Sequence, residues 1–390
     1  MTGMTRRSLL AGACSLAAHP LMSTVTLAAA PWDARLVVII LRGGMDGLDA
    51  VQPYGDRALA GYRPRLKTGP EAGHADLDGY FGLNQGLNRL LPLWRAGSLS
   101  FAHAVATPYR DKRSHFDGQD LLEAGTGTLD APDSAGGGWL NRFLAGQPGV
   151  ETETAFAVGQ DELRILAGTA PAARWSPDAR IRLSPQAEQL LHHVYAPDAL
   201  FAPALSEALQ LAAEAAPDGS GDLTGGGRRE PLAAFAADRL NGDTRIAAYS
   251  LTGWDTHRGQ QAALGRALDR LQRSVLTLRE GLGHNWGRTL VLAMTEFGRT
   301  VAENGSRGTD HGTGGAMLMA GGALRAAKVF GDWPGLAEAE LYRRRDLMPT
   351  DDVRRYAAWA LRGLYGVRRG LLEQTVFPGL GLGDDPGLVA

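Results

Sequence analysis

Short apolar runs of strand length alternate with amphipathic stretches of helical length through most of the chain. The clearest run is residues 35–41, whose unbroken apolar stretch is typical of a strand buried on both faces. Similar runs predict further strands at residues 99–105, 245–251, 289–295 and 316–320. This alternation predicts an α/β fold in which helices cover both faces of a central sheet.

Helices are predicted where apolar residues recur at spacings of three and four. In the longest, residues 259–282, Leu264, Leu268 and Leu271 would share one face. The other predicted helices cover residues 86–95, 116–123, 139–144, 185–195, 206–215 and 351–365. Two smaller strands, residues 155–158 and 163–166, are predicted to pair. Residues 217–229, rich in Gly and Asp, are predicted to form a flexible loop.

The first thirty residues have the pattern of an export signal. Arg6 and Arg7 precede an uncharged run of small and apolar residues, 11–30, as in a twin-arginine signal peptide. The run is only moderately apolar, so no stable membrane anchor is expected. We therefore predict a signal peptide at residues 1–30 and a single domain at residues 31–390. The protein would use the twin-arginine export machinery and work in the periplasm or outside the cell.

Composition excludes several classes of protein. The one cysteine, Cys14, falls within the predicted signal, so the mature chain would have neither disulfides nor thiolate metal ligands. The formal net charge is only −2, and no basic stripe is interleaved with aromatic residues. A nucleic acid is therefore not an expected partner. Small anionic or neutral ligands are expected instead.

Residues suited to metal binding or catalysis fall in four loops that follow predicted strands or lie between two of them. These residues are Asp46, Ser114, His115, Asp255, His257, Glu296, Asp310 and His311. In open parallel sheets, ligand sites lie beyond the carboxyl ends of the strands, so these loops are expected to converge. Carboxylate and imidazole groups together suit a divalent metal centre of the hydrolytic type. The predicted metal ligands are Asp46, Asp255, His257, Glu296, Asp310 and His311.

Each of these residues also has a structural interpretation. Asp46 follows two glycines, which suits a turn or a helix cap. Asp255 suits an Asx turn, His257 the start of a helix, and His311 a brace within a loop. Glu296 could form an ion pair with a nearby arginine.

An anion-binding lining is also predicted. Gly43, Gly44 and residues 312–315 would bring backbone N–H groups close to a bound ligand. Arg42, Arg113 or Arg299 could balance an anionic charge. A nucleotide-binding loop is not expected, because no glycine-rich loop precedes Lys-Ser or Lys-Thr.

At these residues the sequence resembles a bacterial family known as domain-of-unknown-function family 1501, whose members are typically exported by the twin-arginine route. The matching pieces are residues 42–48, 113–116, 138–140, 253–257, 295–299 and 308–312. The family itself looks like a branch of the alkaline phosphatase and sulfatase superfamily. That resemblance implies a mixed, mostly parallel sheet between helices, with a metal site at the strand ends.

By the same resemblance, Asp46, Asp255, His257, Glu296 and His311 would ligate metal, with Asp310 beside them. Ser114 would lie nearest to the position of the nucleophile, and its neighbours Arg113 and His115 are also predicted to act in catalysis. The chain departs from alkaline phosphatases in the close spacing of Asp255 and His257. It also lacks the cysteine-containing or serine-containing proline motif that a sulfatase converts into its nucleophile.

The leading hypothesis is an exported hydrolase of phosphate or related esters that depends on a divalent metal: zinc, calcium, magnesium or manganese. A small anionic ester would be its substrate. The alternative is an inactive periplasmic binding or scaffold protein that keeps the same fold. A periplasmic protein partner would be compatible with both hypotheses.

Overall fold

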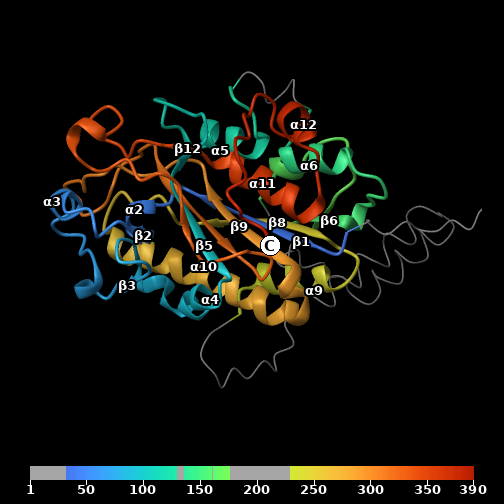
Figure 1. Ribbon diagram of the computed structural model, residues 1–390, viewed down its shortest axis with the longest axis horizontal. Coiled ribbons are helices and arrows are strands. Elements are labelled where there is room, and N and C mark those ends of the chain that lie inside the picture. Colours follow the sequence, from blue (N-terminus) through green and yellow to red (C-terminus); the bar gives the residue numbers. More distant parts are fainter. Residues whose placement is uncertain (1–31, 130–135, 160, 176–228) are drawn as a thin grey trace, which may run out of the picture.

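The computed structural model describes residues 32–129, 136–159, 161–175 and 229–390. Within them, nine strands form one sheet (Figure 1). Eight follow in the order β11 (Val329–Phe330), β5 (Leu99–Ala106), β10 (Gly315–Ala320), β9 (Thr289–Thr295), β1 (Arg35–Arg42), β8 (Ile246–Thr252), β6 (Ala155–Val158) and β7 (Ala173–Trp175). The ninth, β12 (Asp351–Asp352), pairs with β5.

The sheet is mixed and mostly parallel, as predicted. Every pairing is parallel except the two that β10 makes with β5 and β9. At its centre β1 pairs with β8 on one side and β9 on the other. Because successive side chains of a strand point to opposite faces, Val38 and Ile40 enter one core and Val37 and Ile39 the other. The unbroken apolar run is thus explained by burial on both faces.

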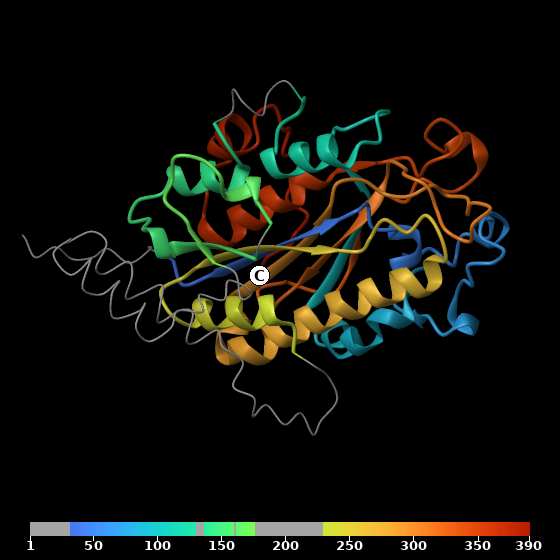
Figure 2. The same cartoon turned by 180° about the vertical axis from the view of Figure 1, so that it is seen from behind.

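Helices cover both faces, which confirms the predicted layers (Figures 1 and 2). One face carries α5 (His115–Ala124), α6 (Trp139–Ala145), α11 (Val353–Tyr365) and α12 (Arg369–Leu371). The other face carries α4 (Leu91–Arg95), α9 (Pro231–Asn241) and α10 (Gln260–Leu282). The predicted face of α10, including Leu264, Leu268 and Leu271, is buried against the sheet.

A smaller unit, absent from the sequence-based predictions, follows β1. It contains α2 (Gly47–Ala50), α3 (Ala58–Tyr62) and a three-stranded sheet of β2 (Val51–Gln52), β4 (Gly82–Leu83) and β3 (Ala75–Asp76). The strands of this unit are two residues long, too short to show an alternating pattern.

Short 3-10 turns occur along the described chain, at Pro70–Ala72, Gln85–Leu90, Thr152–Thr154, Arg164–Leu166, Gly283–Arg288 and Glu338–Glu340. A π-helical turn covers Leu372–Val376.

One predicted strand pair is wrong. Residues 163–166 do not form a strand, because Arg164–Leu166 is a 3-10 turn whose apolar side chains are buried against α6. Strand β6 pairs instead with β7 on one side and β8 on the other. A short apolar run fits a buried turn as well as a strand, so burial alone misled the prediction.

Other predictions fall outside the described residues. They are the signal peptide at residues 1–30, the helices at 185–195 and 206–215, and all of the 217–229 loop except Arg229. Among the described helices, none combines the length and apolar character needed to cross a membrane.

The fold brings the four loops to one edge of the sheet. Strands β1, β8 and β9 are parallel, so the segments after Arg42, Thr252 and Thr295 leave from the same edge. Strand β5 runs parallel to β9, because both are antiparallel to β10, and its carboxyl end meets them there. The loop that enters β10 also lies at this edge, as expected for a site beyond strand ends.

Candidate metal centre

A cluster of ligand-type side chains lies at the carboxyl edge of the sheet. His115 begins α5, Asp255 follows β8, and His311 lies in the loop that enters β10. One donor atom from each of these residues lies within 4.8 Å of the others. His257 adjoins this group, and the four residues are called the histidine cluster below. The spacing of Asp255 and His257 therefore does bring their side chains together.

The donor atoms meet around a single carboxylate oxygen. Asp255 Oδ1 lies 3.1 Å from His257 Nε2, 3.1 Å from His311 Nε2 and 3.5 Å from His115 Nε2. The Nε2 atoms of His257 and His311 are 3.0 Å apart. Zinc bonds to imidazole nitrogen are about 2.0–2.1 Å long, so tetrahedral ligands lie roughly 3.3–3.4 Å from one another. These four distances bracket this value, although His257 is not a member of the group in which all donor atoms lie within 4.8 Å of one another.

The other ring nitrogens determine which atoms carry protons. His115 Nδ1 contacts Glu296 Oε1 at 2.8 Å, and His257 Nδ1 contacts Asp310 Oδ1 at 3.0 Å. His311 Nδ1 contacts the Arg113 carbonyl at 3.0 Å. All three partners are acceptors, so each Nδ1 must donate, and each neutral ring presents a lone pair at Nε2.

This arrangement fits a bound cation. Imidazole lone pairs and a carboxylate oxygen converge with no proton between them when the rings are neutral. In addition, His115 Nε2 is buried and makes no hydrogen bond within the described residues. Buried polar atoms normally have a partner. A carboxylate or carbonyl behind each metal-bound imidazole is also the usual way in which proteins orient histidine ligands.

The members of the cluster differ in their ionisation. The hydrogen bond to Glu296 raises the pKa of His115, so a cation at Nε2 would compete with a proton there. Burial lowers the pKa of His311. Burial opposes ionisation of Asp255, but Arg299 and the neighbouring imidazoles outweigh it and leave the Asp255 pKa lowered. The carboxylate is therefore charged and ready to ligate.

Arg299 holds the loops together beneath Asp255. Its buried guanidinium donates to the carbonyls of Gly43, Gly44, Trp254 and Thr309, and to Asp255 Oδ1 at 2.5 Å. With these acceptors it is a structural brace, not a free cation for a ligand. Gly43 has a φ of +123°, and a Cβ there would lie 2.6 Å from the Asp255 backbone nitrogen.

Asp46 lies in different surroundings. Its buried carboxylate accepts two hydrogen bonds from Arg63, at 2.9 and 3.1 Å, and one from Gln260 at 2.6 Å. Thr309 Oγ1 lies 3.4 Å away. These four residues are called the Asp46 cluster below. The structure does not bring Asp46 into the histidine cluster, and its assignment as a metal ligand stays a prediction.

Glu296 and Asp310 lie behind imidazoles. Glu296 is completely buried, and its Oε1 accepts from His115, Gln119 and the Gly43 backbone. Burial opposes its ionisation, but these hydrogen bonds leave the Glu296 pKa lowered. Both carboxylates are placed to orient a histidine, and direct ligation by either stays a prediction.

The predicted catalytic residues lie at the start of α5. Ser114 caps the helix, and its hydroxyl accepts from the Asp117 backbone at 3.4 Å. Arg113 has a φ of 55°, a conformation uncommon outside glycine, which accompanies the contact of its carbonyl with His311. The Arg113 side chain is 40% exposed, and its guanidinium lies 3.9 Å from the Asp346 carboxylate. Arg42 forms an ion pair with Glu123 at 2.9 Å, so its charge is already balanced within the protein.

Several residues of the site were missed from the sequence. Arg63 and Gln260 hold Asp46, and Gln119 supports Glu296. Arg63 follows a short helix without a periodic pattern, so no sequence signal distinguishes it from a surface arginine. The sequence could have indicated Gln119, because it lies four residues after His115 and hence on the same side of α5.

The fold and the site define an α/β protein with a histidine and carboxylate centre at the carboxyl edge of its sheet. The model of the family described as "Protein of unknown function (DUF1501)" matches residues 94–354, and the chain belongs to this family. No curated protein matches the chain.

Solved structures with similarity to the chain include alkaline phosphatases and related proteins. A Vibrio parahaemolyticus protein of the alkaline phosphatase superfamily is 10% identical, with a TM-score of 0.32, over 77% of this chain and 64% of its own. The lipoteichoic acid synthase LtaP of Listeria monocytogenes is 8% identical, with a TM-score of 0.31, over 71% and 59%. Alkaline phosphatase from the Antarctic bacterium TAB5 is 9% identical, with a TM-score of 0.34, over 77% and 95%. The chain thus spans less than two thirds of the first two structures.

Proposed function

We propose that this protein is an exported, metal-dependent hydrolase of phosphate or related esters. The observation that carries the proposal is the convergence of the His115, His257 and His311 Nε2 lone pairs on Asp255 Oδ1. Such a set of acceptors is stable only around a cation or a proton. The half-exposed Asp255, with 47% of its side chain accessible, leaves the centre open to a small substrate.

His115, Asp255 and His311 would hold the cation, with His257 at a fourth position. Imidazole-rich sets with one carboxylate suit zinc better than calcium, magnesium or manganese, which favour oxygen ligands. A bound divalent cation would polarise an ester oxygen and make a nearby hydroxyl or water a better nucleophile. Glu296 and Asp310 would keep the His115 and His257 rings oriented by accepting from their Nδ1 protons.

The start of α5 supports an anionic substrate. His115 is the first residue of this ten-residue helix, so the helix N-terminus lies at the candidate metal centre. Free backbone N–H groups and the helix dipole favour an anion at such a position. The partly exposed guanidinium of Arg113 provides a second positive group on the same segment. Ser114, between Arg113 and His115, would supply the nucleophile, or a water molecule would take that role.

The activity test uses purified protein reconstituted with zinc or manganese. Aryl phosphate monoesters, phosphate diesters and sulfate esters would be assayed with wild type, Ser114→Ala and Asp255→Asn. Hydrolysis by wild type that Asp255→Asn abolishes is expected. Loss of activity in Ser114→Ala with unchanged metal content assigns the nucleophile to the serine, and full activity assigns it to water. No hydrolysis of any ester by metal-loaded wild type would contradict the proposal.

A second candidate is a metal-binding protein without turnover. Within the described residues, the Ser114 hydroxyl accepts the cap hydrogen bond of α5, and no hydrogen bond joins it to a histidine or a carboxylate. This favours a centre that holds a ligand without attacking it. Tight, metal-dependent binding of an unhydrolysed phosphate or sulfate would favour this candidate.

Export is part of the proposal and rests on Arg6 and Arg7 with the run that follows them. Changing both arginines to lysine is expected to retain the full-length protein in the cytoplasm. Cell fractionation would measure this, with a Lys-for-Arg change at the exposed Arg65 as the matched control. Normal export of the double variant would contradict the twin-arginine assignment.

A further inference from the structure

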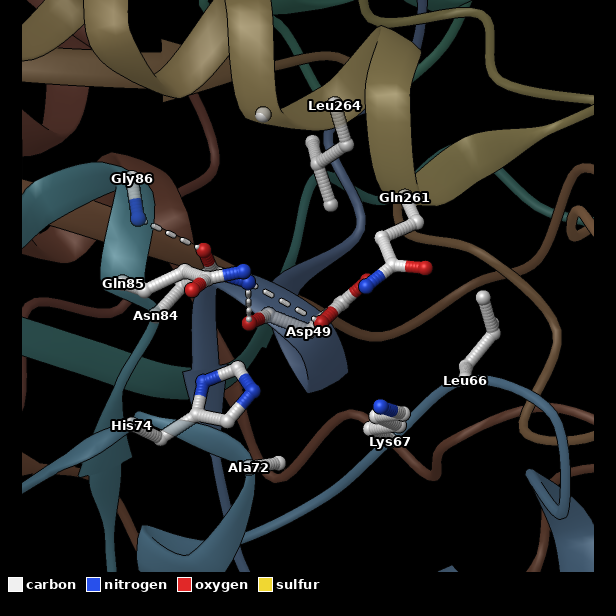
Figure 3. A pocket seen from close by; sticks show the side chains of 11 residues that line it. Asp49, Leu66, Lys67, Ala72, His74, Asn84, Gln85, Gly86, Gln261 and Leu264 are labelled. Carbon is white, nitrogen blue, oxygen red and sulfur yellow. Dashed lines mark hydrogen bonds between the residues drawn. The ribbon is translucent and has the colours of Figure 1, made fainter.

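A polar cavity lies apart from the histidine cluster, between the small unit after β1 and helix α10. Its volume is about 270 Å³, and its walls include Asp49, Lys67, His74, Asn84, Gln261 and Leu264. Figure 3 shows these side chains around the opening, with Asp49 at the centre and the His74 ring turned towards it. None of the residues of the histidine cluster lines this cavity.

Negative charge is in excess beside the cavity. The buried carboxylates of Asp46 and Asp49 share one amide group, because Gln260 Nε2 donates to Asp46 Oδ2 at 2.6 Å and to Asp49 Oδ2 at 3.0 Å. Arg63 is directed to Asp46, with which it forms an ion pair. In the part of the chain that the structure describes, no ion pair includes Asp49, whose nearest partners are neutral amides.

The amides leave room for one more donor at Asp49. Oδ1 accepts from Gln52 and from Asn84, each at 3.1 Å, whereas Oδ2 accepts only from Gln260. A carboxylate oxygen can accept two hydrogen bonds, so Oδ2 has one lone pair free. Burial, followed by the neighbouring Asp46, raises the pKa of Asp49, as expected for a buried acid without a cation.

His74 provides a second free group. The residue is only 6% exposed, and its Nδ1 is buried without a hydrogen-bond partner among the described residues. Burial lowers the pKa of His74, so the ring is neutral near pH 7. An unpartnered ring nitrogen so deeply buried needs an explanation, and a bound donor supplies one.

We propose that this cavity binds a small molecule carrying a protonated amine, with its ammonium group between the Asp49 carboxylate and His74 Nδ1. An ammonium group has three donors and one positive charge, which match the free lone pair, the ring nitrogen and the excess of carboxylate. Lys67 gives another wall a positive charge, so the remainder of the ligand is neutral or anionic. The proposal is independent of the metal centre and of hydrolysis.

The experiment measures binding to the intact protein by calorimetry and by ligand-observed NMR. The probes are propylamine, β-alanine and, as a neutral control of similar size, 1-propanol. Propylamine or β-alanine is expected to bind, and 1-propanol is not. Equal binding of 1-propanol, or no binding of either amine, would overturn the proposal.

Variants locate the binding site. Asp49→Asn keeps the size of the side chain and is expected to weaken amine binding at least tenfold. The matched control is Glu71→Gln, which removes the same charge from an exposed position just before the cavity wall. Unchanged amine affinity in Asp49→Asn would contradict the assignment. If that variant does not fold, His74→Leu takes its place, and the same loss of affinity is expected because Nδ1 is removed.

Discussion

Two groups of residues at the carboxyl edge of the sheet contain a carboxylate that was predicted to bind metal, and they differ in what surrounds it. In the Asp46 cluster the carboxylate accepts from Arg63 and Gln260, so donors surround an acceptor. In the histidine cluster Asp255 accepts from Arg299, yet three more acceptors, the Nε2 atoms, lie against it.

The difference separates a structural role from a binding role. A buried carboxylate that faces a guanidinium is electrically balanced without a ligand. Asp255 also faces a guanidinium, that of Arg299, so what lacks a partner in the histidine cluster is the set of imidazole lone pairs, which need a cation or a proton between them and the carboxylate. Exposure follows the same division, because the Asp46 side chain is fully buried and that of Asp255 is 47% exposed. The residue types alone do not distinguish the two cases, but the hydrogen-bond partners do.

The largest expected effect comes from breaking the ion pair of the Asp46 cluster. Arg63→Met leaves Asp46 buried without its cation, since the two side chains are 1% and 0% exposed. Removing one partner of a buried ion pair costs about 3–5 kcal/mol. Urea unfolding would measure this loss, with metal affinity unchanged in the folded variant.

The double variant Asp46→Asn with Arg63→Met provides the control. Removing both charges is expected to restore part of the lost stability, because no unpaired charge remains. If Asp46→Asn alone abolished metal binding, Asp46 would belong to the metal centre and the comparison would fail.

The next effect concerns the carboxylate of the histidine cluster. Asp255→Asn keeps a group that Arg299 can donate to, but it removes the charge facing the imidazoles. Four-ligand zinc sites have apparent binding free energies of about 10–16 kcal/mol, so one ligand accounts for roughly 3 kcal/mol, or about a hundredfold in affinity. Competition with a chromophoric chelator would measure the affinity. An affinity equal to that of wild type would remove Asp255 from the site.

A smaller loss of metal affinity is expected from changing Glu296, the residue that orients the His115 ring. Glu296→Gln weakens the acceptor that orients the His115 ring, and such changes reduce metal affinity by about 10–100-fold. The same chelator competition applies. A loss as large as that in a His115→Ala variant would indicate that Glu296 itself is a ligand, as the sequence predicted.

The smallest effect is a pH dependence at Asp49. Its folded-state pKa is raised by burial and by Asp46, so its contribution to stability is present below the ordinary value of 3.8 and is lost as pH rises through the folded pKa. The free energy of unfolding of wild type relative to Asp49→Asn should therefore fall as pH rises, by about 1.4 kcal/mol per unit of pKa shift. Unfolding curves between acid and neutral pH would measure it, and a constant or rising difference would show that the Asp49 pKa is not raised.

The sequence was most informative where a pattern repeats. The continuous apolar run of β1 and the spacing of leucines in α10 predicted buried elements, because one periodicity determines which faces are covered. The placement of four loops after strands also predicted their convergence. Both inferences depend on backbone geometry that every parallel sheet shares.

The sequence was least informative where a partner comes from a distant segment. Arg63 and Asp46 pair across a short irregular unit, and nothing in the residues around Arg63 marks it as buried. His115 was predicted to act in catalysis, whereas its Nε2 lies in the metal-type cluster. Which nitrogen or oxygen atom faces a neighbour depends on tertiary packing, and no local pattern records it.

The most direct test of the metal centre is elemental analysis of the purified protein beside a His115→Ala and His311→Ala double variant. Zinc or manganese titration of both proteins after chelator treatment would accompany it. The account predicts about one equivalent of divalent metal in wild type and none in the double variant, with Arg63→Met retaining the metal in its folded fraction. Metal-free wild type that also fails to bind added zinc or manganese would contradict the central claim.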